Sequence, residues 1–154
     1  GYGMHVSNGI LYNHESPRRG ENFVTQKIVR GAAFIAQGKT EFLELGNLDI
    51  ERDWGHAPDY VLGMWMMLQQ EIGADYILAT GKTHKLSDFL QLSFEYFGLD
   101  HQKHIRINQK FVRPNEPVQL CGDSSKAQNV LGWKPSVSFK QIVKSMCEAA
   151  QKSN

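Results

Sequence analysis

Three short stretches of the chain combine positive charge with flexible or polar backbone. They are residues 16–20 (SPRRG), 52–56 (RDWGH) and 111–116 (FVRPNE). Guanidinium groups bind phosphate oxygens in a bidentate way, so arginines in such loops suit a phosphorylated ligand. The sequence therefore offers three candidate contacts for phosphate.

Each stretch also has an ordinary structural explanation. The alternatives are a solvated loop for Arg18 and Arg19, a loop-fixing role for Arg113, and an ion pair of Arg52 with Asp53 or Asp59. From the residues alone, phosphate binding and these structural roles are equally good interpretations.

Lys27 lies about one helical turn beyond Phe23 and Val24. A helix that buries those two residues can still aim the Lys27 ammonium at a ligand near its start. An ordinary surface lysine is the alternative interpretation.

Metal binding and disulfide formation are poorly supported by the pattern. His14 and His56 stand among charged residues without a metal-ligand spacing, so we expect no metal site. Cys121 and Cys147 are the two cysteines, and neither belongs to a C-x-x-C motif. We expect both thiols to be reduced and structural.

Two motifs of nicotinamide-dependent enzymes are missing from the sequence. No G-x-G-x-x-G turn is present to hold the phosphates of a dinucleotide. No tyrosine is followed four residues later by lysine, the spacing that would lower the pKa of a catalytic phenol. The sequence therefore shows neither a phosphate-binding turn for NAD or NADP nor a tyrosine–lysine pair.

Composition narrows the class of protein further. With 154 residues, the chain can form one core but has little room for two. The net charge is +1 and the basic residues are spread out, which disfavours nucleic acid and membrane surfaces as partners. The apolar stretches are too short to span a bilayer and no signal-like start is present, so we expect a cytoplasmic protein.

Hydrophobic periodicity predicts alternating strands and helices. Strands are expected at residues 5–12, 41–45, 76–80 and 104–107, and helices at residues 22–37, 59–70, 87–97, 123–132 and from 139 onward. A capping box at Ser138 and Gln141 starts the last helix, and residues 111–122 are expected to be irregular. This alternation predicts an α/β fold.

One apolar face is expected on the helix at residues 59–70. Its members are Tyr60, Val61, Met64, Trp65 and Leu68. We interpret this stripe as part of the core rather than as a cofactor-binding surface.

The run at residues 8–25 (NGILYNHESPRRGENFVT) closely resembles a signature of GDP-mannose 4,6-dehydratases, which belong to the extended short-chain dehydrogenase/reductase family. The likeness continues through residues 45–60, 66–70, 111–114 and 131–135 and covers nearly the whole chain. The stretches RDW and LGWKP are features shared by many nucleotide-sugar epimerases and dehydratases, whereas NHESPRRGE at residues 13–21 points to the GDP-mannose enzymes. Departures from the family occur at residues 108–110 and 117–119.

The resemblance implies a role for particular residues. His14 and Arg19 match positions that contact NADP in the family, and the positions around the GDP-sugar are matched by Asn13, Val24, Lys27, Arg52, Arg113 and Glu116. The basic side chains would neutralise the diphosphate, and Glu116 would accept hydrogen bonds from ribose hydroxyls or guanine nitrogens.

The implied reaction moves a hydride from the hexose C4 to NADP, removes water across C5 and C6, and returns the hydride to C6. The resemblance places the catalytic groups before residue 1 and makes residues 1–154 a single carboxy-terminal, nucleotide-sugar-binding domain, with residues 1–13 as a strand left from the Rossmann sheet. It also implies a homo-oligomer that forms through the Arg18–Arg19 loop. We expect the chain alone to be inactive.

Two alternatives remain open at this stage. Another epimerase or dehydratase that acts on UDP- or dTDP-sugars would share the general motifs. A non-catalytic module that binds nucleotide sugars, or docks onto an intact relative, would also fit.

Overall fold

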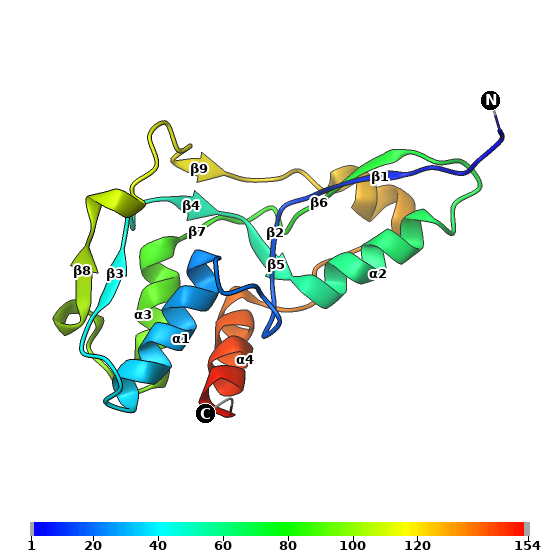
Figure 1. Cartoon of the computed structure of the whole chain (residues 1–154). Coiled ribbons are helices and arrows are strands. Elements are labelled where there is room, and N and C mark those ends of the chain that lie inside the picture. The colour runs from blue at the N-terminus through cyan, green and yellow to red at the C-terminus, as the bar shows by residue number, and fades with distance from the viewer. Residues whose placement is uncertain (1, 153–154) are drawn as a thin grey trace.

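A computed structural model describes residues 2–152 and shows a mixed α/β fold (Figure 1). The helices are α1 (Val24–Ala36), α2 (Ala57–Met67), α3 (Leu86–Tyr96) and α4 (Phe139–Lys152), with short helical turns η1 (His101–Lys103), η2 (Gln109–Phe111) and η3 (Ala127–Leu131). The strands are β1 (Asn8–Leu11), β2 (Asn13–Glu15), β3 (Leu43–Leu45), β4 (Glu51–Arg52), β5 (Trp54–His56), β6 (Asp75–Leu78), β7 (His84–Lys85), β8 (Ile105–Ile107) and β9 (Gln119–Leu120). The predicted helices are confirmed, while β9 is a short strand in a stretch that we expected to be irregular. His14 lies in β2, Arg52 in β4 and His56 in β5, so the expectation that these residues stand in loops is wrong, because their backbone pairs with distant strands.

The strands form small sheets. β1 pairs with β6, β2 with β5 and β3 with β8, each pair being parallel. The remaining sheet has the order β7-β4-β9, in which β4 is antiparallel to β7 and parallel to β9. Parallel pairing over long sequence separations is typical of α/β architecture.

The larger of two cores lies among α1, α3 and α4. It contains Ile28, Phe89, Phe94 and Ile142, which are fully buried. The predicted capping box starts α4, because the Ser138 N–H donates to Gln141 Oε1 at 2.9 Å and the Gln141 N–H donates to Ser138 Oγ at 3.4 Å. These helices form the body against which the loops described below are held.

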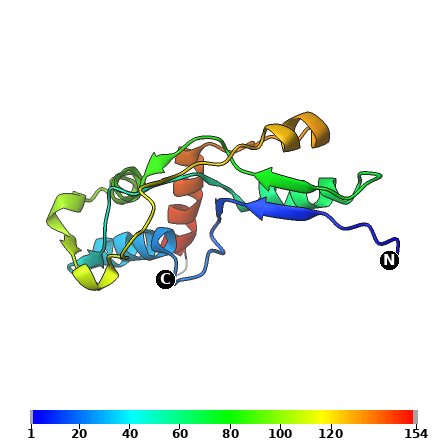
Figure 2. The same cartoon turned by 90° about the horizontal axis from the view of Figure 1, so that it is seen from above.

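A smaller core lies between α2, β6 and η3 and is built around Tyr60, Tyr76 and Trp133. The expectation of one core, made from the length of the chain, is therefore wrong. Together with β1, these elements form an arm that extends from the helical body (Figure 1). Figure 2 shows β1 and β6 side by side, both running toward the helical body. In residues 2–152, β1 has no second strand beside it, so its outer edge is open.

The prediction that the apolar stripe of α2 belongs to the core is wrong for most of its members. Tyr60 is fully buried, but Val61, Trp65 and Leu68 are 60% exposed or more. Met64 is also exposed. α2 is apolar on two faces: Tyr60, Gly63 and Met67 pack inward, and the residues of the second face are exposed.

Both cysteines are free thiols, Cys147 buried in the larger core and Cys121 exposed. Burial raises the pKa of the Cys147 thiol to about 12. In the part of the chain that the structure describes, no helix has the length and apolar character needed to cross a bilayer.

Candidate nucleotide-binding site

Helix α1 begins without a side-chain cap. Its N-cap residue, Phe23, makes no side-chain capping bond, and no acidic residue stands in the first turn. The first N–H groups of a helix point outward and carry a partial positive charge. The start of α1, including Val24, is therefore suited to an anion, and the basic residues described next lie around it.

Strand β2 presents His14 in a defined orientation. His14 Nδ1 lies 2.8 Å from the carbonyl oxygen of Tyr12. A carbonyl oxygen can only accept a hydrogen bond, so His14 Nδ1 is the donor, and this bond fixes the orientation of the ring. Asn13, the preceding residue on β2, is half-buried.

Arg19 is held in place, unlike its neighbour Arg18. The Arg19 guanidinium lies 3.5 Å from the centre of the Phe23 ring, and its Nη1 donates to the His14 carbonyl oxygen at 3.3 Å. Arg18 is exposed. The solvated-loop interpretation therefore fits Arg18 and is wrong for Arg19.

Glu15 is a buried carboxylate that forms an ion pair with Arg19. Its carboxylate is 1% exposed, accepts a 2.6 Å hydrogen bond from Thr25 Oγ1 and lies 3.4 Å from Arg19 Nε. Burial raises the pKa of Glu15, while the Thr25 hydrogen bond and the Arg19 charge act in the opposite direction. Glu15 thus ties β2, the following loop and α1 together.

Lys27 is directed to the segment that follows β8. Its ammonium lies 3.8 Å from the centre of the Phe111 ring. Lys27 is half-buried and Phe111 is 49% exposed, so the pair lies at the surface. A cation at this distance over a ring face is attracted by the ring quadrupole.

Arg52 lies almost completely buried against the same segment. Its Nη2 donates to Glu116 Oε1 at 2.8 Å, and its Nη1 donates to the carbonyl oxygens of Glu51 and Pro117 at 2.8 and 2.9 Å. The expected alternative, an ion pair with Asp53 or Asp59, is wrong. Arg52 instead fastens β4 to residues 116–118.

Asp53 has a separate structural role. It is fully buried and accepts hydrogen bonds from the Thr80 N–H and hydroxyl and from the N–H groups of Gly81 and Gly122. Two segments, at Thr80–Gly81 and at Gly122, are thereby held next to Arg52. Sequence reasoning missed this role because the partners lie 27, 28 and 69 residues away.

Arg113 is exposed and makes no ion pair in residues 2–152. It lies on the segment 109–118, between the contacts of Lys27 and Arg52. Of the predicted residues, this segment contains Arg113 and Glu116 and is contacted by Lys27 and Arg52. The others, Asn13, His14, Arg19 and Val24, lie around β2 and the start of α1.

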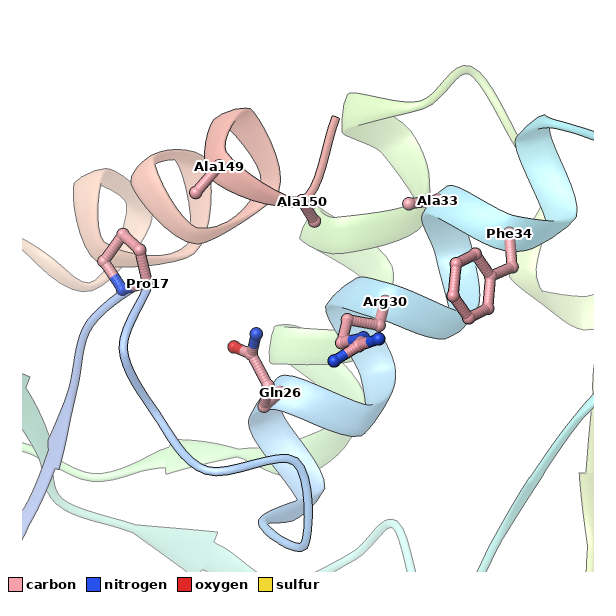
Figure 3. Close-up of a pocket in the computed structure, with 7 residues that line it drawn as sticks. All are labelled: Pro17, Gln26, Arg30, Ala33, Phe34, Ala149 and Ala150. Atoms are coloured by element: carbon pink, nitrogen blue, oxygen red, sulfur yellow. The ribbon is translucent and has the colours of Figure 1, made fainter. Parts of the chain in front are cut away.

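Two hollows elsewhere on the molecule contain none of these residues. Figure 3 shows the first, a cavity of about 110 Å³ into which Gln26 and Arg30 extend from α1 beside Pro17. The second is an open groove of about 690 Å³ between α3 and the segment before α4. Its hydroxyls already have partners, since Ser136 is bound to Asp59 and Ser138 to Gln141. In residues 2–152 no group of three or more possible metal-ligating side chains is found.

Comparison with protein families and curated proteins gives a consistent result. A family model described as GDP-mannose 4,6 dehydratase matches residues 1–146. GDP-mannose 4,6 dehydratase 1 of Arabidopsis thaliana is 52% identical over 147 residues, which cover 96% of this chain and 41% of that protein. The human GDP-mannose 4,6 dehydratase is 43% identical over 165 residues, with 96% of this chain and 44% of the relative covered. The chain thus spans about two fifths of the length of these relatives.

Solved structures confirm the predicted fold class. RMD from Pseudomonas aeruginosa, complexed with NADPH, has a TM-score of 0.86 and 22% identity and covers 95% of this chain and 48% of its own. UDP-glucuronic acid 4-epimerase from Bacillus cereus, in complex with UDP-glucuronic acid and NAD, has a TM-score of 0.82 and 16% identity. The match covers 98% of this chain and 46% of the epimerase chain. The chain therefore has the α/β fold of part of an extended short-chain dehydrogenase/reductase.

Proposed function

Because this chain belongs to the GDP-mannose 4,6-dehydratase family, we propose that it forms the nucleotide-sugar-binding part of such an enzyme. The whole enzyme is a lyase that converts GDP-mannose to GDP-4-dehydro-6-deoxymannose and water. The observation that carries this proposal is the gathering of Lys27, Arg52, Arg113 and Glu116 at one segment, as a phosphorylated ligand requires.

The basic residues would bind the diphosphate in different ways. Lys27 and Arg113 supply cationic groups at the surface, and the uncapped start of α1 adds N–H groups near Val24. Arg52 keeps the 116–118 segment in place. Its bonds to Glu116 and to the neighbouring carbonyl oxygens use Nη1 and Nη2, so the Nε–H would be the group that binds the diphosphate. Asn13 and Glu116 would hydrogen-bond the sugar and the nucleoside.

The residues near β2 fit a nicotinamide cofactor, for which we propose NADP. The Tyr12 carbonyl holds the His14 ring, and the Arg19 guanidinium is held by Phe23 and Glu15. NADP, when bound, would take up a hydride and return it. His14 and Arg19 would orient it, and Glu15 would fix the guanidinium.

We infer that residues 1–154 act as one domain beside a cofactor-binding half, with residues 1–13 joining the sheet of that half. The open edge of β1 and the uncovered apolar face of α2 support this arrangement, because both suit contact with further sheet and helix. Alone, the chain would bind the nucleotide sugar without turning it over. Two free thiols support a cytoplasmic location.

The Arg18–Arg19 loop is the surface through which the intact enzyme would form a homo-oligomer. Exposed Arg18 supports this role, whereas Arg19 is committed to Phe23 and Glu15. Membrane and nucleic acid are not among the proposed partners, in line with the net charge of +1.

Calorimetric titration of the purified chain tests the proposed function. We expect saturable binding of GDP-mannose and much weaker binding of UDP-glucose and NADPH. Lys27→Met should weaken GDP-mannose binding by about tenfold or more, because a charge-assisted hydrogen bond is lost.

The control is Lys144→Met, which removes a lysine that pairs with Glu148 on α4. This variant should bind GDP-mannose like the unaltered chain. Equal binding of GDP-mannose and UDP-glucose would favour a less selective nucleotide-sugar module. A folded chain that binds none of these ligands would contradict the proposal.

A further inference from the structure

We propose that Phe111 is a positioning residue, which holds the ammonium of Lys27 in the direction of the diphosphate of the bound nucleotide sugar. This inference rests on the proposed function and adds to it a residue without a polar side chain. The two partners come from distant elements, since Lys27 lies on α1 and Phe111 ends η2. Their contact is 3.8 Å from the ammonium to the ring centre.

The backbone at Phe111 is firmly placed, so its ring is a suitable support. The Asn108 N–H donates to the Leu45 carbonyl oxygen at 2.8 Å, and Asn108 Nδ2 donates to Glu44 Oε2 at 3.0 Å. Asn108 Oδ1 in turn accepts from the Lys110 N–H at 3.0 Å. η2 is thereby anchored to β3.

Gly46 makes the closest approach to this turn. A Cβ at Gly46 would lie 2.5 Å from the Phe111 carbonyl oxygen and 2.8 Å from its carbonyl carbon. Because both atoms belong to the backbone, they cannot move aside without shifting η2. Gly46 is therefore required for the position of Phe111, and through it for the position of Lys27.

A positioned lysine binds an anion more tightly than a mobile one. A lysine side chain has several rotatable bonds, and ordering it on binding opposes affinity. The Phe111 ring restricts the ammonium before the ligand arrives, yet it covers only one side of the group. The remaining N–H donors can still reach phosphate oxygens.

Four variants of the full 154-residue chain test the inference by calorimetry with GDP-mannose. Phe111→Leu should raise the dissociation constant about two- to fivefold, the size expected for an exposed cation–π pair. Phe111→Tyr should restore binding, because tyrosine keeps the ring face. Gly46→Ala should reproduce the effect of Phe111→Leu. In the background of Lys27→Met, Phe111→Leu should have no further effect.

Phe34→Leu is the matched control. Phe34 lies on the same helix, and the Lys39 ammonium is 5.4 Å from its ring centre, but the pair is far along α1 from the start. The same substitution there should leave GDP-mannose binding unchanged. An equal loss in Phe34→Leu and Phe111→Leu would overturn the inference, since the effect would then be one of general stability.

A spectroscopic reading separates this inference from the proposed function. After reductive methylation of lysines with carbon-13 formaldehyde, the Lys27 signal should be shifted upfield by the ring current of Phe111. It should move back in Phe111→Leu but not in Phe34→Leu. A Lys27 chemical shift that is the same in Phe111→Leu as in the unaltered chain overturns the inference, whether or not GDP-mannose binds. A shifted signal in a chain that binds no GDP-mannose would sink the proposed function and, with it, the role assigned to Phe111.

Discussion

Arg52 and Asp53 are neighbours in the chain, but they secure different parts of the site. Arg52 binds the 116–118 segment, whereas Asp53 holds the turns at Thr80 and Gly122 from the other side. Since a buried carboxylate needs partners for its charge, these hydrogen bonds satisfy Asp53 as much as they place the turns.

Asp53→Ala should lower the free energy of unfolding by about 2–4 kcal/mol, because buried N–H donors lose their acceptor. Chemical denaturation followed by circular dichroism measures this change. Asp123→Ala provides the comparison, since Asp123 is exposed and its hydrogen-bond partner is the nearby Ser125. A loss in Asp53→Ala no greater than that in Asp123→Ala would show that Asp53 does not hold the turns.

At the residue scale, sequence reasoning selects candidate ligand-binding positions but not the residues that hold them in place. Lys27, Arg52 and Glu116 were named because their types suit a diphosphate or match a family position. Their partners, such as Phe111 for Lys27, are set by tertiary contacts between distant segments. No local pattern encodes such a contact.

At the scale of elements, periodicity located the helices well. α1, α3 and α4 bury one face each, and a 3.6-residue repeat predicts that arrangement. α2 differs because it is apolar on more than one face, so its sequence cannot show which face meets the core of this chain. Packing of Tyr60 against Trp133, a residue far along the chain, decides it.

Two substitutions on α2 distinguish its faces. Trp65 is 60% exposed and Met67 is 3% exposed, although they are two positions apart. Trp65→Lys should change the free energy of unfolding by less than about 0.5 kcal/mol, whereas Met67→Ala should lower it by about 2–5 kcal/mol. Thermal or urea denaturation of both variants gives the comparison. A larger loss of unfolding free energy in Trp65→Lys than in Met67→Ala would contradict this assignment, because it would mean that the second face of α2 is buried in the isolated chain.

At the scale of the whole molecule, the helical body and the arm differ in the groups that they expose. The body contains the larger core and the segment that gathers Lys27, Arg52, Arg113 and Glu116. The arm presents the open edge of β1 and the uncovered face of α2. The alternation of strands and helices predicts the α/β fold, and the family resemblance predicts that the chain matches only part of its relatives. The chain length predicts one core, whereas the structure has two.

The most direct test of the account is a chimera in which this chain replaces the matching segment of the Arabidopsis relative. We expect the chimera to bind NADP and to convert GDP-mannose to GDP-4-dehydro-6-deoxymannose, measured by chromatography of the products. The chain alone should show no turnover, and Trp65→Lys in the chimera should lower activity by disturbing the contact between the halves. A folded chimera that binds NADP but leaves GDP-mannose unchanged, beside an active parent, would contradict the central claim.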